Sequence, residues 1–169
     1  MGGSDTEPNR SGWSRHPPSL GRLATRPARL SVPPRVLLDT GFIVALVNAV
    51  DPDHGRCREA WSGLRAQLVT VEGVLVEATY LLRRARGGPA AAINLVLAAG
   101  TRLIAPTEPR LVRAVELMQT YRDVPMDLVD ALLVVSAEEL NITQVLSLDR
   151  RGFSAYRANG RRGFEILPG

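Results

Sequence analysis

The 169-residue chain contains no lysine and one cysteine, Cys57, and only 5% of its residues are aromatic. A single cysteine excludes an internal disulfide and a cysteine-based zinc site, and it predicts a reducing, cytoplasmic setting. Because aromatics are scarce while 45% of the residues are hydrophobic, the core must consist of Leu, Val, Ile and Ala, which favours α/β or α packing. With only His16 and His54 present, a His-rich metal site is excluded.

Long apolar runs and leader segments are also missing. Spanning a bilayer takes about 20 apolar residues, and the longest candidate, Phe42 to Val50, is interrupted by Asn48. The N-terminus lacks the apolar segment of a signal peptide, and its prolines disfavour the amphipathic helix of a transit peptide. Dinucleotide and P-loop signatures are absent as well. We therefore expect no membrane segment, no export signal and no nucleotide cofactor.

All 21 basic residues are arginine, and their distribution divides the chain. Residues 1–34 hold five Arg against Asp5 and Glu7, are rich in Gly, Ser and Pro, and lack a hydrophobic period, so we predict a disordered tail. Residues 35–169, the predicted folded domain, hold 16 Arg against 15 acids. This near balance is not that of a generally basic nucleic-acid binder.

Short apolar runs alternate with helical stretches through the predicted domain. The pattern predicts strands at 35–39, 69–71, 102–105, 144–148 and 164–167, and helices at 40–50, 54–68, 73–86, 90–99, 109–121 and 127–140. Strands that alternate with helices imply a mostly parallel sheet covered by helices on both faces.

Two aspartates follow directly on apolar strands. Asp39 closes the run Val36 to Leu38, and Asp149 closes the run Val145 to Leu148. In open parallel sheets, ligands bind beyond the carboxyl ends of the strands, where the strand order reverses. Each aspartate could equally belong to an ordinary turn, so neither identifies a site by itself.

Three further acids lie in predicted helices. Glu77 shares a helical face with Val74 and Leu81, so its carboxylate should lie near the core, where an unpaired charge is costly. Asp127 and Asp130 are three residues apart and share one face of the helix that begins there. Both also suit a purely structural role, since Asp127 is a good N-cap and Asp130 would favour the helix dipole.

The convergence of these acids is more informative than any one of them. Carboxylates brought together repel one another, and such a cluster favours hard cations with oxygen ligands, typically Mg²⁺ or Mn²⁺. These ions activate water and stabilise charge at phosphorus, which is the chemistry of nucleases. The sequence therefore predicts a metal-dependent phosphodiester hydrolase.

The same residues resemble a PIN domain, and in particular its VapC-type toxin branch. The resemblance rests on the strand leading into Asp39-Thr40, on helix-borne Glu77, and on the segments 126–133 (MDLVDALL) and 146–153 (LSLDRRGF), and it covers about residues 35–169. It implies a three-layer α/β/α sandwich with a five-stranded parallel sheet and cleavage of single-stranded RNA by water activated by Mg²⁺ or Mn²⁺. It further implies that Asp39, Glu77, Asp130 and Asp149 are catalytic metal ligands and that Asp127 assists them.

Two positions depart from the pattern of this branch. A small hydroxyl residue commonly lies two positions after the first aspartate, where this chain has Gly41. A second aspartate commonly follows the fourth ligand, where this chain has Gly152. The first departure concerns hydrogen bonding to Asp39, and the second concerns a second metal.

Apart from the five proposed site acids, the predicted domain has an excess of positive charge, which suits RNA binding. Without the five acids, ten acids face 16 Arg in the predicted domain. Five arginines follow Asp149 closely and are either a solvated basic face or a rim that tracks phosphates: Arg150, Arg151, Arg157, Arg161 and Arg162. Tyr156 and Phe153 are candidates for stacking on bases, although Phe153 better suits the core.

Other functions fit the sequence less well than a nuclease does. Asp39-Thr40-Gly41 matches the aspartic-protease triplet, but that fold is all-β, and a haloacid-dehalogenase-like phosphatase would need a second aspartate at Gly41. An inactive PIN-like RNA-binding or scaffold module and a housekeeping PIN nuclease remain as alternatives. The resemblance implies a homodimer and a small antitoxin partner, with the helix 90–99 and the stripe Trp61-Leu64-Leu68 as candidate contact surfaces. The helical face of His54, Cys57 and Trp61 is expected to serve packing.

Overall fold

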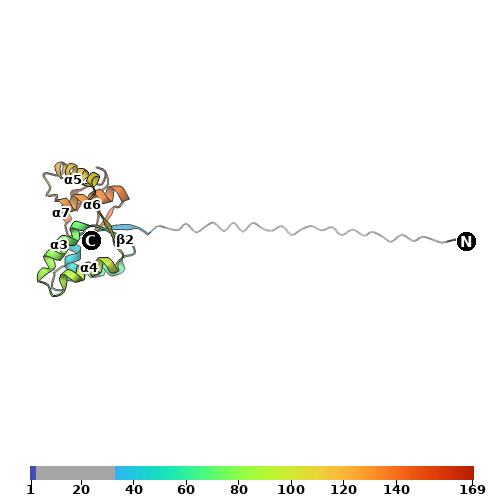
Figure 1. Ribbon diagram of the computed structural model, residues 1–169, viewed down its shortest axis with the longest axis horizontal. Helices are drawn as coiled ribbons and strands as arrows, with labels where there is room; N and C mark the ends of the chain where they lie inside the picture. Colours follow the sequence, from blue (N-terminus) through green and yellow to red (C-terminus); the bar gives the residue numbers. More distant parts are fainter. Residues whose placement is uncertain (3–32) are drawn as a thin grey trace. The chain divides into compact units, whose positions relative to one another are not determined.

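The computed structural model describes residues 1, 2 and 33–169, so the predicted tail lies almost wholly outside the described residues. Strands and helices alternate along the remainder (Figure 1). The elements are β1 (Arg35–Leu38), α1 (Thr40–Val47), α2 (His54–Gly63), β2 (Gln67–Val71), α3 (Glu72–Leu81), η1 (Leu82–Arg84), α4 (Gly88–Ala98), β3 (Arg102–Ile104), α5 (Glu108–Thr120), α6 (Leu128–Leu140), β4 (Gln144–Leu146), α7 (Arg150–Ala155) and β5 (Glu165–Leu167).

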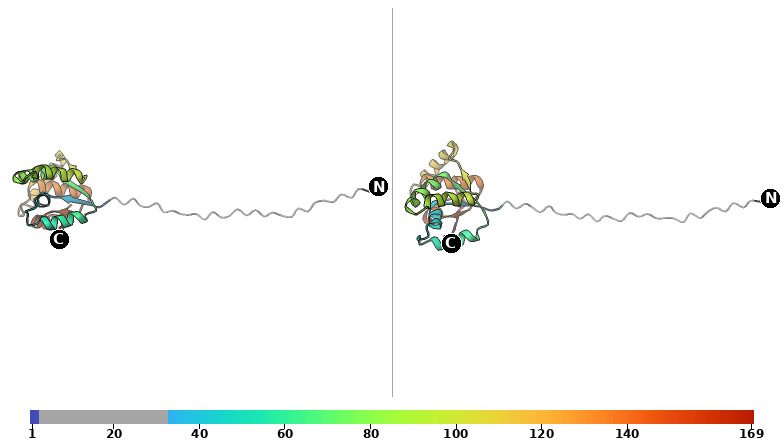
Figure 2. Two further views of the ribbon diagram at one scale, coloured as in Figure 1. Left: turned by 90° about the horizontal axis from the view of Figure 1, so that it is seen from below. Right: turned by 60° about the horizontal axis from the view of Figure 1, so that its bottom comes forward.

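The five strands form one sheet in the order β3-β2-β1-β4-β5, and every neighbouring pair is parallel. Helices lie on both sides of this sheet (Figure 2), which confirms the predicted α/β/α fold class. The strand order reverses at β1, since the chain goes from β1 outward to β2 and β3 and later returns to β4 on the other side. The carboxyl ends of β1 and β4 therefore border the crevice in which such folds bind ligands.

The core explains why these segments are strands and helices. Val36, Leu37 and Leu38 of β1 are completely buried, as expected for the central strand of a covered parallel sheet. Residues 131–137 of α6 are all buried, so this helix is apolar around its circumference and packs against both β2 and α5. The two elements that carry Asp39 and Asp130 are thus among the best anchored in the fold.

The predicted helix 54–68 is too long. Helix α2 ends at Gly63, because Leu64 takes an extended backbone conformation and the chain enters β2 at Gln67. Leu68 is buried in that strand with 3% exposure, whereas Trp61 packs near Phe42 with ring centroids 6.4 Å apart. The stripe Trp61-Leu64-Leu68 is therefore not a helical face, and the buried Leu68 cannot belong to a contact surface.

Other boundaries also differ from prediction: the helix expected at 40–50 ends at Val47, and the strand expected at 144–148 ends at Leu146. The helix expected at 73–86 is α3 up to Leu81 followed by the 3-10 turn η1, which buries Leu82 and leaves Leu81 55% exposed. The short helix α7 was not predicted at all, because six residues that include Gly152 show too little periodicity. The expected packing face of α2 is confirmed, since Cys57 is fully buried and His54 Nδ1 lies 2.9 Å from the Ala45 carbonyl.

Candidate functional site

The site begins with Asp39, directly beyond the central strand. Its carboxylate caps α1 by accepting a 2.6 Å hydrogen bond from the Thr40 backbone N–H, and its other oxygen accepts a 2.6 Å bond from the Ser147 hydroxyl. Asp39 is 8% exposed and Ser147 is 1% exposed, so both bonds are protected from water. The backbone of Asp39 also donates to the Leu146 carbonyl, which ties the ends of β1 and β4 together.

Asp149 follows β4 and lies beside Asp39. The Ser147 hydroxyl accepts a 2.9 Å bond from the Asp149 backbone N–H, so this one hydroxyl contacts both aspartates. The Asp149 side chain caps α7 by accepting from the Gly152 N–H at 3.0 Å. Asp149 is exposed, which leaves its carboxylate accessible from solvent.

Glu77 joins the group from α3. Its carboxylate accepts a 2.8 Å bond from the hydroxyl of Thr40, the residue next to Asp39. Glu77 is half-buried, as expected for a residue between the core and the surface, although Leu81 on the predicted shared face is exposed. Thr40 therefore links the carboxylates of the first two predicted ligands through its backbone and its side chain.

Asp130 and Asp127 come from the start of α6. Asp127 is the N-cap, and its carboxylate accepts a 2.9 Å bond from the Asp130 N–H, so the expected structural role of Asp127 is confirmed. The half-buried carboxylate of Asp130 accepts a 3.2 Å bond from the Tyr156 hydroxyl. Asp127 is exposed and lies at the rim of the group.

A close approach of two helices helps to bring these acids together. An ideal Cβ at Gly73, in the first turn of α3, would lie only 2.7 Å from the Val129 Cγ2 on α6. The absent side chain lets the start of α3 pack against the start of α6, and these two helices carry Glu77 and Asp130. The requirement for glycine here is steric and could not be recognised in the sequence alone.

The pKa values show that the carboxylates affect one another. Burial raises the pKa of Asp39 from 3.8 to about 6, while the bonds from Ser147 and Thr40 lower it and the charges of Asp149 and Glu77 raise it. Burial likewise raises the pKa of Asp130 to about 7, with further increases from the charges of Asp127, Asp39 and Asp149. The structure thus brings Asp39, Glu77, Asp127, Asp130 and Asp149 into electrostatic contact.

The donor set suits a hard divalent cation. Within the described residues, no three His, Cys, Asp or Glu side chains already form a complete metal site. All the same, no arginine or histidine side chain in the described residues bonds to any of the five carboxylates, and their charges raise the pKa of Asp39 and Asp130. The group therefore lacks a counter-charge. Oxygen-only ligands of this kind prefer Mg²⁺ or Mn²⁺.

The five predicted arginines have different surroundings. Arg157 donates to the carbonyls of Ser154, Ala155 and Tyr156, so it caps the end of α7. Arg162 donates to the Asn141 side chain, and Arg150 to the Pro168 carbonyl. Arg151 and Arg161 are exposed and make no side-chain hydrogen bond within the described residues. Arg150 is exposed as well, whereas Arg157 and Arg162 are half-buried, so Arg150, Arg151 and Arg161 remain the best placed of the five to contact a phosphate.

Tyr156 and Phe153 cannot stack on bases, because both are completely buried. Their rings pack edge-to-face with centroids 5.6 Å apart, and the prediction of base stacking by Tyr156 is wrong. Two residues of the site, Thr40 and Ser147, were given no role from the sequence, and Tyr156 was given the wrong one. The small hydroxyl expected at position 41 has its counterpart in Ser147, whose position two residues before Asp149 was the available signal.

Comparisons with known proteins agree with this geometry. A family model described as PIN domain matches residues 36–159. The chain is 30% identical over 135 residues to Ribonuclease VapC26 of Mycobacterium tuberculosis, which covers 79% of this chain and 100% of that protein. No helix in the described residues is long and apolar enough to cross a membrane.

Solved structures show the same architecture. The crystal structure of Mycobacterium tuberculosis VapC20, a sarcin–ricin loop cleaving toxin, is similar with a TM-score of 0.63 and 27% identity, over 69% of this chain and 92% of that one. A toxin–antitoxin complex from Klebsiella pneumoniae gives a TM-score of 0.57 at 15% identity, over 73% and 93% of the two chains. At that identity the second likeness concerns the fold alone.

Proposed function

The chain belongs to the PIN-domain family, in its VapC-type branch, and from this premise we propose that it is a metal-dependent endoribonuclease and the toxin of a toxin–antitoxin pair. The observation that carries the proposal is the meeting of Asp39, Glu77, Asp130 and Asp149 at the strand-order reversal of a parallel sheet. The names of two relatives support the same reaction class, since one is Ribonuclease VapC26 and the other, VapC20, is described as a sarcin–ricin loop cleaving toxin.

The four acids would hold Mg²⁺ or Mn²⁺, with Asp127 in support. The bound ion would supply an activated water and stabilise negative charge at the phosphorus. Ser147 and Thr40 orient the carboxylates of Asp39 and Glu77 through short hydrogen bonds, so these two ligands are held before any cation arrives. Such pre-positioning lowers the cost of ordering the site on binding.

The substrate we propose is single-stranded RNA or a single-stranded loop within structured RNA. Asp149 and Asp127 are exposed, so the acidic centre is open to a polymer rather than enclosed as it would be for a small metabolite. Arg150, Arg151 and Arg161 follow Asp149 and would contact phosphates of the bound strand.

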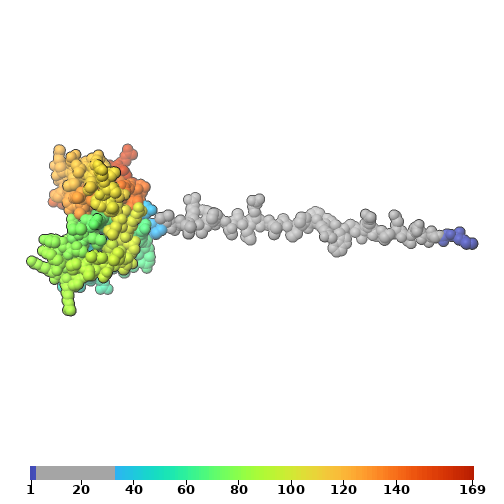
Figure 3. All heavy atoms as spheres, viewed as in Figure 1, coloured from blue at the N-terminus to red at the C-terminus, as the bar shows by residue number. Residues whose placement is uncertain are grey.

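A small antitoxin and a second copy of the chain are the proposed partners. Apolar side chains are exposed on the neighbouring helices α3 and α4, including Val76 at 63%, Ile93 at 43% and Leu97 at 67%. Both helices lie on the face drawn in green in Figure 3. The predicted contact surface on the helix 90–99 thus gains support, and light scattering with and without the product of the adjacent gene tests both partners.

The catalytic proposal is tested with the purified full chain and a fluorogenic single-stranded RNA. We expect cleavage with Mg²⁺ or Mn²⁺, loss of cleavage in EDTA, and recovery on adding either ion. Cleavage that continues in EDTA would overturn the metal dependence. Binding of the RNA without cleavage in either metal would instead favour an inactive RNA-binding module.

A further inference from the structure

We propose that Tyr156 is a positioning residue for Asp130, and that its buried hydroxyl holds this carboxylate turned toward Asp39 for metal binding. The inference rests on the proposed nuclease function and adds a residue to it. No metal ligand role is assigned to Tyr156 itself, since its hydroxyl acts only through Asp130.

The contact geometry carries the inference. The Tyr156 hydroxyl lies 2.6 Å from the Pro125 carbonyl oxygen and 3.2 Å from Asp130 Oδ2, and the side chain is 0% exposed. A phenol has one proton, which is here shared between two acceptors on either side of the α6 N-cap. The hydroxyl thereby connects α7 to the segment in which α6 begins.

Asp130 needs such support because its neighbours repel it. It lies in the first turn of α6, half-exposed, with the negative charges of Asp127, Asp39 and Asp149 close enough to raise its pKa. Without a donor on the inner side, repulsion would turn the carboxylate away from Asp39 and toward solvent. The Tyr156 bond engages Oδ2 and leaves Oδ1 for a cation.

Gly152 makes room for the hydroxyl. An ideal Cβ at this position would overlap Asp149 Oδ2 and would lie 2.8 Å from the Tyr156 hydroxyl oxygen. The site therefore has no space for the second aspartate expected after the fourth ligand in this branch. Instead, the Tyr156 hydroxyl contacts Asp130, the third predicted ligand. The glycine at position 152 is thus what allows Tyr156 to make this contact.

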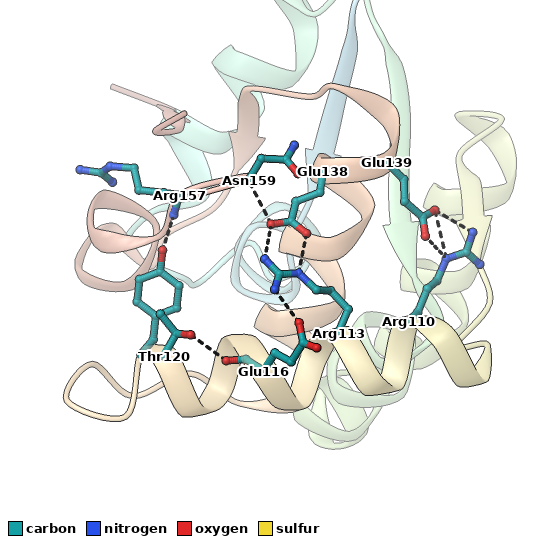
Figure 4. Close-up of polar contacts among 9 residues, drawn as sticks. Arg110, Arg113, Glu116, Thr120, Glu138, Glu139, Arg157 and Asn159 are labelled. Atoms are coloured by element: carbon teal, nitrogen blue, oxygen red, sulfur yellow. Dashed lines mark hydrogen bonds and ion pairs between the residues drawn. The ribbon is translucent and has the colours of Figure 1, made fainter. Parts of the chain in front are cut away.

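Aromatic packing fixes the position of the Tyr156 ring. It packs edge-to-face on Tyr121, with centroids 5.3 Å apart, and on Phe153. The loop after α7 is fixed to α6, because Glu138 accepts from the Asn159 N–H and is itself held by Arg113 of α5 (Figure 4). A hydroxyl on so rigid a support can define the direction of a carboxylate.

Tyr156→Phe tests the inference, and Tyr121→Phe is its matched control. Both variants remove one phenol hydroxyl from the same aromatic cluster, but the Tyr121 hydroxyl bonds to a backbone N–H and not to a carboxylate. Mn²⁺ binding to the full chain is measured by calorimetry and by electron paramagnetic resonance, and melting temperatures are recorded in EDTA. We expect Tyr156→Phe to weaken Mn²⁺ binding by about tenfold, the lower range for loss of a partner behind a metal ligand, and Tyr121→Phe to leave it unchanged.

Cleavage measured against metal concentration gives a second readout. Tyr156→Phe should raise the Mn²⁺ concentration needed for half-maximal cleavage, whereas its rate at saturating Mn²⁺ should approach that of the wild type. Equal Mn²⁺ affinity in Tyr156→Phe and the wild type would overturn the positioning role and leave the nuclease standing. Equal weakening in both variants would show a loss of packing rather than positioning. A wild-type chain that binds no Mn²⁺ and cleaves no RNA would overturn the proposed function itself.

Discussion

Ser147 and Asp39, 108 positions apart in the sequence, are joined by a 2.6 Å hydrogen bond in which the serine hydroxyl donates to the aspartate Oδ2. The same hydroxyl accepts from the Asp149 N–H, so one buried serine fixes two acids that follow neighbouring strands. Ser147 is 1% exposed, so both bonds are buried, and together they connect the ends of β1 and β4 at the site.

Ser147→Ala should therefore weaken the site more than the fold. Losing a buried bond to a carboxylate costs about 1.5–3 kcal/mol, and it removes a donor that lowers the pKa of Asp39. We expect weaker Mn²⁺ binding and slower RNA cleavage. Ser136→Ala is the control, because that serine is equally buried but donates only to the Leu132 carbonyl of its own helix. Equal metal affinity in the two variants would contradict the role of Ser147.

Asp39→Asn should abolish cleavage without destabilising the metal-free protein. Losing a metal ligand should reduce activity by more than the roughly 10- to 100-fold that follows the loss of a residue bonded to a ligand. The amide removes a buried charge that Asp149 and Glu77 repel, so the melting temperature in EDTA should stay the same or rise. A fall of several degrees in EDTA would mark Asp39 as a structural cap, and retained cleavage would exclude it as a ligand.

The stability of the metal-free protein should decrease as the pH rises from about 4 to 7. The folded-state pKa values of Asp39 and Asp130, about 6 and about 7, lie above the unfolded value near 4, so the folded state binds more protons in this window. The shift at Asp39 alone corresponds to on the order of 3 kcal/mol. Urea unfolding in EDTA at several pH values measures how the free energy of unfolding depends on pH. This dependence should be weaker in Asp39→Asn, and weaker in the wild type when Mn²⁺ replaces EDTA.

Gly41→Ala should be tolerated, in contrast to Gly152→Ala. An ideal Cβ at Gly41 meets Leu148 Cβ at 3.6 Å and Asp39 Oδ2 at 4.0 Å, which are ordinary contacts, and alanine favours the helix by up to about 1 kcal/mol. At Gly152 the Cβ would displace Asp149 or Tyr156. Thermal unfolding and Mn²⁺ titration of both variants measure the difference. A Gly152→Ala variant that binds Mn²⁺ like the wild type would show that the space around α7 adjusts freely.

Substituting the arginines near Asp149 should affect RNA binding in some cases and stability in others. The double variant Arg151→Ala with Arg161→Ala should weaken binding of single-stranded RNA, with little change in stability, and its salt slope should fall by about 0.7 for each phosphate that is no longer neutralised. Arg157→Ala should mainly lower the melting temperature, because its guanidinium caps α7. Binding is measured on the Asp39→Asn background to prevent cleavage. An unchanged salt slope in the double variant would place the RNA path elsewhere.

The sequence sufficed to predict the parallel sheet and the proximity of Asp39 and Asp149, because both depend on local patterns. Apolar runs ending in Asp39 and Asp149 define strands and their carboxyl ends, and parallel pairing brings those ends to one edge of the sheet. The same patterns failed at residues 64–68, where Leu64 and Leu68 fit a helical period equally well. Tertiary burial of Leu68 beside Val36 decided for the strand.

The parts of the site that escaped prediction depend on contacts between distant segments. The aromatic side chain of Tyr156 suggested stacking on bases. Its ring is instead buried by Tyr121 and Phe153, and only the fold shows this. Gly73 was expected only as the start of a helix, and Gly152 only as a departure from the VapC-type pattern, whereas their role is to admit Val129 and the Tyr156 hydroxyl. Steric requirements of this kind leave no periodic signal.

The pairing of β1 with β4 has a consequence for folding kinetics. Leu37 lies opposite Val145 and Leu38 opposite Leu146, so the pairing that unites Asp39 with Asp149 closes a loop of more than 100 residues. Contacts between such distant residues form late, since their loop-closure entropy must be offset first, whereas helices such as α5 and α6 can form locally. During refolding, helical circular dichroism should recover before RNA cleavage does. A chain that has only its local structure would be harmless to RNA.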